Sequence, residues 1–555
     1  MDIVITSTRR TAARTLTITA LSCALLTTGT VAGPVAATSD SSAPTADVSV
    51  TAEVSGAERE PAAGVGTFRS AGTEQRLALG VTHESLTLGN PGSEYSWTVQ
   101  VTLPSGQTGV RDSHVSSRGT AHRVATELRE AGLEARAGAV VADRLADAGG
   151  YLGHRVRVGA FRTEAEAEAT RSELTALGYS GGTWYEGWDG DQPSSGPRGG
   201  PVNVEVLTID PLRFKGEVTG TFGEDLERTE TVSELADGAL AGVNAGFFVY
   251  GEQHGAPGDP AGAAAYNGDI LSETVGDRPN LVIDHRSGRA SIQRLTWEGR
   301  ISAGRQGLDL DGINRVPGKI RNCGGTDDLP TEAPKHDVTC TDADEIVVFT
   351  EEYGATTPEG DGLEVVVDRH GRVQEVTQER GTELADGQYS IQAIGEDTAP
   401  LDEFATEAGR IKLTNEYLDE RGKKLRMTPH TQVLNGGPNL LTDGERDITA
   451  SRDGMVHADN PGQFYGWTHQ RNPRTIAGID GRGQLVLITA DGRQTDSVGL
   501  SISEAADLSG RLGLVDAINL DGGGSTAMVV DGELENSPSG GSERAVGDAI
   551  VIRER

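Results

Sequence analysis

The chain has 555 residues and a formal net charge of -34, so it is long enough for two or three domains and a substantial core. Because phosphate groups repel an acidic surface, this charge argues against nucleic acid and anionic membranes as partners. The 75 glycines and the low aromatic content of 4% indicate a fold rich in loops and turns.

The N-terminal segment has the pattern of an export signal. Arg9, Arg10 and Arg14 precede a short apolar run that ends in small residues, which predicts a secretory signal peptide over residues 1–37. The Arg9-Arg10 pair leaves twin-arginine export open beside general secretion. Cys23, inside the apolar run, leaves a lipoprotein anchor open as an alternative to cleavage.

Residues 38–72 are rich in Ala, Ser, Thr, Pro and Glu, a composition that predicts a disordered leader. No later segment has 18 uninterrupted apolar residues, so we do not expect the mature chain to span a membrane. Cys323 and Cys340 then remain as the cysteines of an exported protein, which predicts one disulfide between them. Two free thiols, or half of a metal site, are the alternatives.

Regular structure is expected from residue 73 onward. Residues 73–112 include the alternating strand "YSWTVQVTLP", which we expect to belong to a large body, with the next module inserted into it. That module, residues 113–188, reads as helix, strand and helix, and its second helix begins with a Thr163/Glu166 capping box. Through "VRVGAFRTEAEAEATRSELTALGY" it resembles the sporulation-related repeat (SPOR) domain family. The resemblance implies binding to peptidoglycan glycan strands, whereas an ordinary packing module is the alternative.

Residues 189–201 are rich in Gly, Pro and Ser and predict a linker. Beyond them, residues 202–555 show short alternating strands separated by Asp-Gly and similar turns, and a helix with a Ser501/Glu504 capping box. We therefore predict an α+β protein: a large mixed α/β body with a small α+β domain attached or inserted.

The segment "INLDGGGSTAMV" carries the strongest indication of chemistry. Gly522, Gly523 and Gly524 could turn consecutive backbone amides into one concavity that suits an anionic oxygen, and Ser525 and Thr526 add hydroxyl donors. Asp521 stands at the edge of this concavity. The segment lacks the lysine of a P-loop and the helix of a nucleophile elbow. We therefore interpret it as a cradle for a phosphate ester.

Other residues at strand ends are candidates to complete this site. Arg474 and Arg544 precede strands, and a guanidinium group matches phosphate oxygens. His469 is a candidate proton donor. Converging strand ends often build a pocket, and three asparagines stand at such ends: Asn244, Asn435 and Asn519.

Five motifs in the same order resemble the phosphodiester glycosidase family: "AGVNAGFF", "LNGGPNLL", "PRTIAGIDGRGQLVLITADGR", "GLSISEAADLSGRLGLVDAINLDGGGSTAMVVDG" and "SERAVGDAIVI". The resemblance spans about residues 202–555, and the segment from Cys323 to Cys340 looks like a local insertion. It implies hydrolysis of a sugar-1-phosphate diester that releases the sugar and leaves a phosphomonoester. It also implies that the site is lined by Asn244, Arg474, Asp491, Asn519, Asp521, Gly523, Ser525, Thr526 and Arg544.

The cleavage of an anomeric phosphate requires charge stabilisation and a carboxylate. We expect Asp521 to supply the carboxylate, with Asp491 or Glu504 as a second acid, and we predict no cofactor and no metal. The predicted partners are a glycosyl-phosphate glycan and, through residues 113–188, peptidoglycan. A glycan-binding protein without catalysis is the main alternative. A wall amidase is a third class, but it would require a zinc or Cys/His constellation that the mature chain lacks.

Overall fold

The computed structural model describes residues 72–90, 95–191 and 199–555. The predicted signal peptide and nearly all of the predicted leader lie outside the described residues, as does most of the predicted linker. Within the described ranges, no helix combines the length and the apolar character needed to cross a membrane.

Over the described residues the protein is mostly β, with 40% of them in strands and 14% in helices. The prediction of a mixed α/β body is therefore wrong. The body is built from antiparallel sheets, and among the described strand pairs only β15 (Gly312–Ile313) with β18 (Glu345–Thr350) is parallel. Neighbouring strands that are connected by short turns run antiparallel, so few crossover helices are needed.

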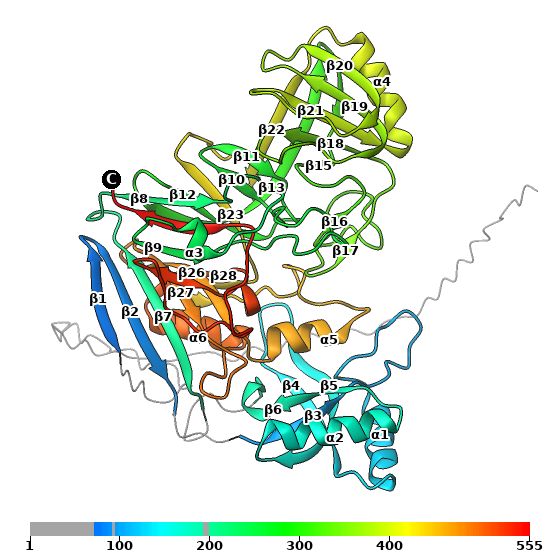
Figure 1. The fold of residues 1–555 in the computed structure, drawn as a ribbon, viewed down its shortest axis with the longest axis vertical. Coiled ribbons are helices and arrows are strands. Elements are labelled where there is room, and N and C mark those ends of the chain that lie inside the picture. Colours follow the sequence, from blue (N-terminus) through cyan, green and yellow to red (C-terminus); the bar gives the residue numbers. More distant parts are fainter. Residues whose placement is uncertain (1–71, 91–94, 192–198) are drawn as a thin grey trace, which may run out of the picture. The chain divides into compact units, whose positions relative to one another are not determined.

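The largest sheet has eight strands (Figure 1), and Arg474, the first residue of one of them, lines the site described below. Its strands alternate between two cores: Val204 and Val206 face one, and Leu207 and Ile209 face the other. This period of two buries both faces of the sheet. The strand order is β1 (Thr73–Ala78), β2 (Val81–Leu88), β7 (Val202–Ile209), β27 (Leu485–Ala490), β26 (Arg474–Asp480), β28 (Leu514–Asn519), β24 (Asn439–Thr442) and β25 (Glu445–Arg446).

A second, five-stranded sheet packs against one face of the first. Leu487 and Ile518 of the large sheet share a core with Val243 and Ile550 of the second. The burial of apolar side chains between the two sheets holds the ends of β9 and β28 close together. Both ends carry candidate site residues. The strand order is β30 (Glu533–Leu534), β29 (Met528–Val530), β9 (Ala241–Asn244), β31 (Ala549–Arg553) and β8 (Glu217–Thr221).

Two further sheets complete the body. One has the order β11 (Asp269–Ser272), β10 (Ala264–Tyr266), β23 (Thr431–Asn435), β12 (Pro279–Asp284), β13 (Arg289–Ala303) and β14 (Gln306–Asp309), with β22 (Lys412–Asp419) also paired to β13. The other has the order β15, β18, β21 (Tyr389–Ile394), β19 (Gly360–Val367) and β20 (Val373–Arg380), with helix α4 (Thr398–Glu407) packed on it. A separate two-stranded sheet pairs β16 (Ile320–Arg321) with β17 (Thr339–Cys340).

Helix α6 (Ile502–Arg511) covers the other face of the large sheet, where Ile502, Ala505 and Leu508 are buried. The predicted capping box is confirmed: the Ser501 side chain accepts from the Glu504 amide, and the Glu504 side chain accepts from the Ser501 amide. These two bonds satisfy amides that the first turn leaves without a partner.

A separate four-stranded sheet contains β4 (Ala135–Ala142), β5 (Gly150–Phe161), β3 (Trp97–Val101) and β6 (Gly181–Tyr185). Helices α1 (Arg118–Glu130) and α2 (Glu164–Ala176) pack against it, and the predicted Thr163/Glu166 capping box of α2 is present. The strand expected in the large body, β3, pairs instead with β5 and β6. By contrast, β1 and β2 join the large sheet through the pairing of β2 with β7.

Candidate active site

The triple-glycine segment follows strand β28, but its amides are not free to form the predicted cradle. The amide of Gly522 donates to the Asp521 carboxylate at 2.9 Å, and the amide of Gly523 donates to the Pro473 carbonyl at 3.0 Å. Both bonds lie inside the protein. The prediction that these consecutive amides receive an anionic oxygen is therefore wrong for Gly522 and Gly523.

The glycines instead make room for two arginines. A Cβ atom on Gly524 would lie 3.0 Å from a terminal nitrogen of Arg544, and one on Gly523 would lie 3.4 Å from a terminal nitrogen of Arg493. Gly523 also has a φ of +62°, which side-chain-bearing residues rarely adopt. The conformational freedom at this turn thus brings two guanidinium groups against the backbone beside Asp521.

Asp521 lies next to these cations. Its carboxylate is 4.0 Å from Arg544, and it also accepts a hydrogen bond from Ser525. Arg544 donates to the Ser525 hydroxyl oxygen, so Ser525 links the two charged groups. Burial raises the pKa of Asp521, while the charge of Arg544 acts in the opposite direction.

A pocket of about 260 Å³ opens beside this turn. Several arginines lie in its wall, and with them aromatic rings and two carboxylates. Its lining residues are Phe247, Phe248, Tyr250, Arg321, Asn322, His336, Asp337, Trp467, Asn472, Arg474, Arg493, Asp521, Gly522, Gly523, Gly524 and Arg544.

Arg474, the first residue of β26, is a buried cation in this wall. Its guanidinium group donates to the carbonyl oxygens of Leu500, Trp467 and Gln470 and lies 5.0 Å from the centre of the Trp467 ring. Carbonyl oxygens orient the group but do not neutralise its charge. Burial, with the charge of Arg493 acting in the same direction, lowers the pKa of Arg474 to about 9.

Arg493 was not among the predicted site residues. Its backbone has a φ of +58°, and its Nε donates to the Asn472 side chain at 3.0 Å. Burial lowers the pKa of Arg493, and the neighbouring charge of Arg544 adds to this effect. Like charges that line one pocket favour the binding of an anionic ligand there.

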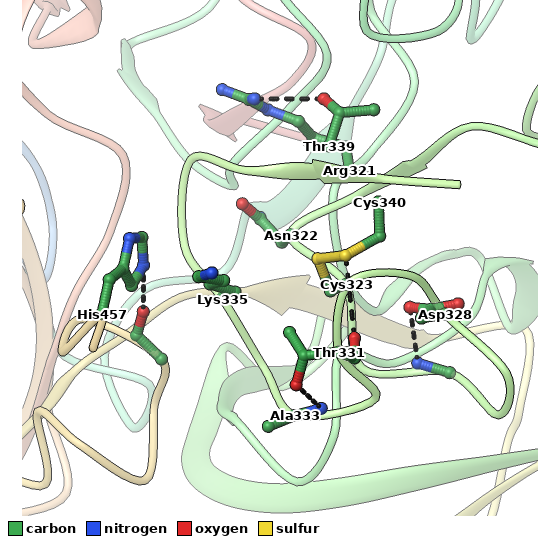
Figure 2. The surroundings of a disulfide bond; sticks show 12 residues. Arg321, Asn322, Cys323, Asp328, Thr331, Ala333, Lys335, Thr339, Cys340 and His457 are labelled. Atoms are coloured by element: carbon green, nitrogen blue, oxygen red, sulfur yellow. Dashed lines mark hydrogen bonds between the residues drawn. A yellow bond between two sulfur atoms is a disulfide. The ribbon is translucent and has the colours of Figure 1, made fainter. Parts of the chain in front are cut away.

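Another part of the pocket wall comes from the segment closed by the disulfide, which the sequence indicated only as a local insertion. Cys323 and Cys340 form the predicted disulfide (Figure 2). Asn322 lies at one end of this segment, and its side chain donates to the Ala261 carbonyl at 2.9 Å and accepts from the Asp337 amide at 2.8 Å. Arg321 forms an ion pair with Asp337, so this loop brings a second carboxylate to the pocket.

His336 also comes from the disulfide-closed segment. Its ring is buried and packs against the rings of both Phe247 and Trp467, with both centre-to-centre distances at 4.6 Å. Burial lowers the pKa of His336 well below its ordinary value, and the charges of Arg278 and Arg321 lower it further. A neutral imidazole in an aromatic wall suits contact with an uncharged part of a ligand.

The three predicted asparagines lie at the ends of their strands but hold loops in place. Asn244 donates to the Asp521 carbonyl at 2.8 Å and accepts from Thr475 and from the Ala527 amide. Asn435 accepts from the Phe247 amide at 2.8 Å. Asn519 is fully buried and donates to the Gly437 carbonyl at 3.2 Å. None of the three lines the pocket.

The two predicted second acids lie outside the pocket. Asp491 accepts from Asn536 at 3.2 Å and from the Ser537 amide at 2.9 Å, and so holds the loop after β30. Glu504 forms a buried ion pair with Arg471 at 2.7 Å. Both carboxylates are therefore satisfied elsewhere, and the structure does not place either of them beside Asp521.

The Thr526 hydroxyl group and the His469 imidazole, which were both predicted as site groups, are also absent from the pocket wall. Thr526 is buried directly behind the glycine turn, and its carbonyl accepts from Asn536 at 3.0 Å. His469 is buried, with its ring stacked against Tyr465 at 5.8 Å. Burial lowers the pKa of His469. Neither group lines the described pocket.

Asp548 supports the loop that carries Phe247, and its ionisation should make the stability of the protein depend on pH. It accepts from the Gly246 amide at 2.7 Å and from Tyr266 at 2.8 Å. Burial raises the pKa of Asp548 from 3.8 to about 6. When folding raises the pKa of a carboxyl group, the folded state loses stability as the pH rises. The loss occurs between the pKa of the group in the unfolded protein and its pKa in the folded protein.

We therefore expect Asp548→Asn, which keeps an acceptor for Gly246, to raise the free energy of unfolding at pH 7.5 by about 1–3 kcal/mol. At pH 4.5 the gain should shrink to well under half of that value. Denaturant unfolding of both proteins at the two pH values measures the difference. A gain that is equal at both pH values would contradict the titration of Asp548.

The sequence of residues 361–553 matches the family model described as phosphodiester glycosidase. The N-acetylglucosamine-1-phosphodiester alpha-N-acetylglucosaminidases of Mus musculus and Homo sapiens are each 36% identical to this chain, over 126 and 128 residues. These alignments cover 22% and 23% of this chain and 24% and 25% of the two relatives. The chain thus matches about a quarter of the length of these curated relatives.

A crystal structure of a presumed exported protein from Burkholderia pseudomallei is similar over most of the chain. The superposition has a TM-score of 0.77 and 29% sequence identity, and covers 88% of this chain and 97% of the other. The range matched by the family model contains Arg474, Asp521 and Arg544. It begins after Asn244 and after the disulfide-closed segment.

Proposed function

We propose that this chain is a secreted phosphodiester glycosidase that hydrolyses a sugar-1-phosphate diester, similar to an N-acetylglucosamine-1-phosphodiester, releasing the sugar and leaving a phosphomonoester. The observation that carries the proposal is the group of guanidinium ions around Asp521 in one pocket. Arg474, Arg493 and Arg544 all line it. The match of residues 361–553 to the phosphodiester glycosidase family supports the same reaction class.

The arginines supply the site for the phosphate. Two of them, Arg474 and Arg493, are buried enough for burial to lower the pKa of each. An anionic diester oxygen would compensate charges that the protein itself leaves next to one another. Donors that are already oriented stabilise the charge that develops on the departing phosphate with little reorganisation.

Two carboxylates remain for the chemistry on the sugar side, Asp521 and Asp337. Both line the pocket, and the charge of Asp337 contributes to the raised pKa of Asp521. Two carboxylates whose charges interact can take different roles: one transfers the proton, and the other stabilises positive charge at the anomeric carbon. We assign the proton-handling role to Asp521 and the second acid to Asp337, in place of Asp491 and Glu504.

The aromatic side of the pocket suits the sugar. Phe247, Tyr250 and Trp467 line it together with His336, whose lowered pKa keeps the imidazole uncharged at neutral pH. Sugar rings present apolar faces, which pack favourably on aromatic rings. The pocket therefore has a cationic end for phosphate and an aromatic side for a carbohydrate.

Release of free sugar from a synthetic N-acetylglucosamine-1-phosphodiester tests this reaction. We expect turnover by the unaltered protein and a large loss in Asp521→Asn. Asp531→Asn is a matched control, because Asp531 is an exposed carboxylate ten residues later on the same segment. If the unaltered protein releases no sugar from a panel of sugar-1-phosphate diesters, a glycan-binding role without catalysis replaces the proposal.

We also propose that the substrate is a cell-wall or extracellular glycan. The disulfide is typical of an oxidising compartment, and the similar Burkholderia protein is described as exported. The predicted signal peptide over residues 1–37 agrees with secretion. The small sheet with helices α1 and α2 is the part that we propose to bind peptidoglycan glycan strands as a SPOR-like domain.

Exposed groups on the small sheet provide a test of this targeting. Tyr151 is 59% exposed, and its hydroxyl group lies 2.7 Å from His154. We expect the full chain to sediment with glycan strands from which the peptides have been removed, and Tyr151→Ala to weaken that sedimentation. Absence of sedimentation by the unaltered chain would remove the peptidoglycan partner without affecting the assay for sugar release.

A further inference from the structure

Three potential metal ligands from distant parts of the sequence meet outside the pocket. They are His83 on β2, Glu205 on β7 and Glu535, which directly follows β30. One ligand atom from each lies within 4.8 Å of the other two, and His83 Nε2 is 2.9 Å from a carboxylate oxygen of Glu205. The His83 and Glu205 side chains are buried, with 5% and 11% exposure, whereas Glu535 is exposed.

The charges around these ligands do not balance. Among the described residues, Glu205 forms its ion pair with His83, and no lysine or arginine pairs with Glu205 or Glu535. Asp491 adds to the negative charge, since the charge of Glu205 helps to raise the pKa of Asp491. Two carboxylates and one imidazole therefore lie together without a lysine or arginine to compensate them, which favours an additional cation.

An unsatisfied oxygen lies on the same face of the sheet. Thr489 is opposite Glu205 in the antiparallel pairing of β27 with β7, and directly opposed residues present their side chains to the same face. Thr489 is fully buried, and its hydroxyl group has no hydrogen-bond partner among the described residues. Buried hydroxyl groups rarely remain without a partner. A hydrated cation next to Glu205 would supply one.

We propose that His83, Glu205 and Glu535 bind a divalent transition-metal cation of the Zn²⁺ class. Imidazole nitrogen and carboxylate oxygen are ligands that such ions prefer, and three protein ligands with water complete a usual coordination shell. The ion would connect β2 and β7 to the loop after β30. Asp491 holds the same loop through Asn536 and Ser537. The role is structural, because none of the three ligands lines the pocket.

Titration of the chelator-treated full chain with ZnCl₂ tests the site by calorimetry and by thermal unfolding. We expect one strong site per chain and a melting temperature that rises with Zn²⁺. Glu535→Gln should weaken this binding at least tenfold and abolish the rise. Glu533→Gln is the matched control, because Glu533 is exposed on the same hairpin and is not among the ligands.

Both variants change exposed side chains, so both are expected to fold as the unaltered chain does. Equal Zn²⁺ affinity in Glu535→Gln and the unaltered chain would overturn the proposal. So would the absence of a strong site, which would leave His83 and Glu205 as an ion pair only. His83→Gln supplies a second readout, since it should remove binding even where Glu535 is intact.

Discussion

Asp521→Asn is expected to lower kcat/KM for a sugar-1-phosphate diester by about 10²–10⁴-fold, the usual contribution of a positioned acid or base. The amide keeps the shape of the side chain and its acceptor for the Gly522 amide, which lies at 2.9 Å. It cannot take up or release the proton. Steady-state kinetics on a diester with a chromogenic leaving group, together with a melting curve, separates lost chemistry from lost folding.

Asp491→Asn is the informative comparison for this variant. Its amide oxygen can still accept from Asn536 and Ser537, and Asp491 does not line the pocket. We expect kcat/KM to stay within about threefold of the unaltered value, as for substitutions away from the reacting groups. A loss in Asp491→Asn as large as that in Asp521→Asn would contradict the assignment of Asp521.

The sequence predicted the local structure at several positions well. Both capping boxes, at Thr163 and Ser501, are present as predicted. A cap depends on residues three positions apart, so its signal is complete within a short segment. The disulfide was predictable for a related reason, because an exported chain with two cysteines offers one pairing.

The fold class was harder to predict because the helices give the clearer pattern. Helix α6 has ten residues with a capping box at its start, whereas strands such as β10 and β29 have three residues each. A strand of three residues shows too few alternations to separate it from a turn. The predicted α/β body therefore gave too much weight to helices and too little to short antiparallel strands.

The glycine turn illustrates a second limit. Its composition correctly indicated a close approach to the backbone, but the approaching groups are the guanidinium groups of Arg493 and Arg544. The Pro473 carbonyl that accepts from Gly523 is 50 positions earlier in the chain. Composition shows that a backbone is accessible, whereas the partner of each amide depends on the tertiary structure.

The pocket residues of the disulfide-closed segment could not have been predicted from spacing. His336 and Asp337 follow neither a regular strand nor a recognisable motif, and they reach the pocket because the loop folds back over Phe247 and Asn322. Arg493 is different: it comes two residues after Asp491, at the end of a predicted strand next to Arg474. A search of strand ends for arginine would have found it.

Replacing both cysteines of the disulfide, Cys323→Ser with Cys340→Ser, should lower both the stability and the activity of the protein. We expect the loss of activity to be second only to that of Asp521→Asn. The bond joins residues 17 positions apart, and release of a loop of this length costs roughly 3 kcal/mol of stability. The loop also carries Asp337, whose amide is held by Asn322 at 2.8 Å. We therefore expect a lower melting temperature and a fall in kcat/KM of at least tenfold.

Thermal unfolding and sugar release, each with and without a thiol reductant, measure both effects. Because the bonded cysteines are buried, the reductant should act on the unaltered protein slowly, and it should leave the Ser variant unchanged. The loss of activity should persist at temperatures far below the melting point of the variant, since the pocket wall is affected even where the protein stays folded. If the folded variant retains full kcat/KM, the disulfide-closed segment stabilises the protein but does not shape its active site, and the assignment of Asp337 as the second acid fails with it.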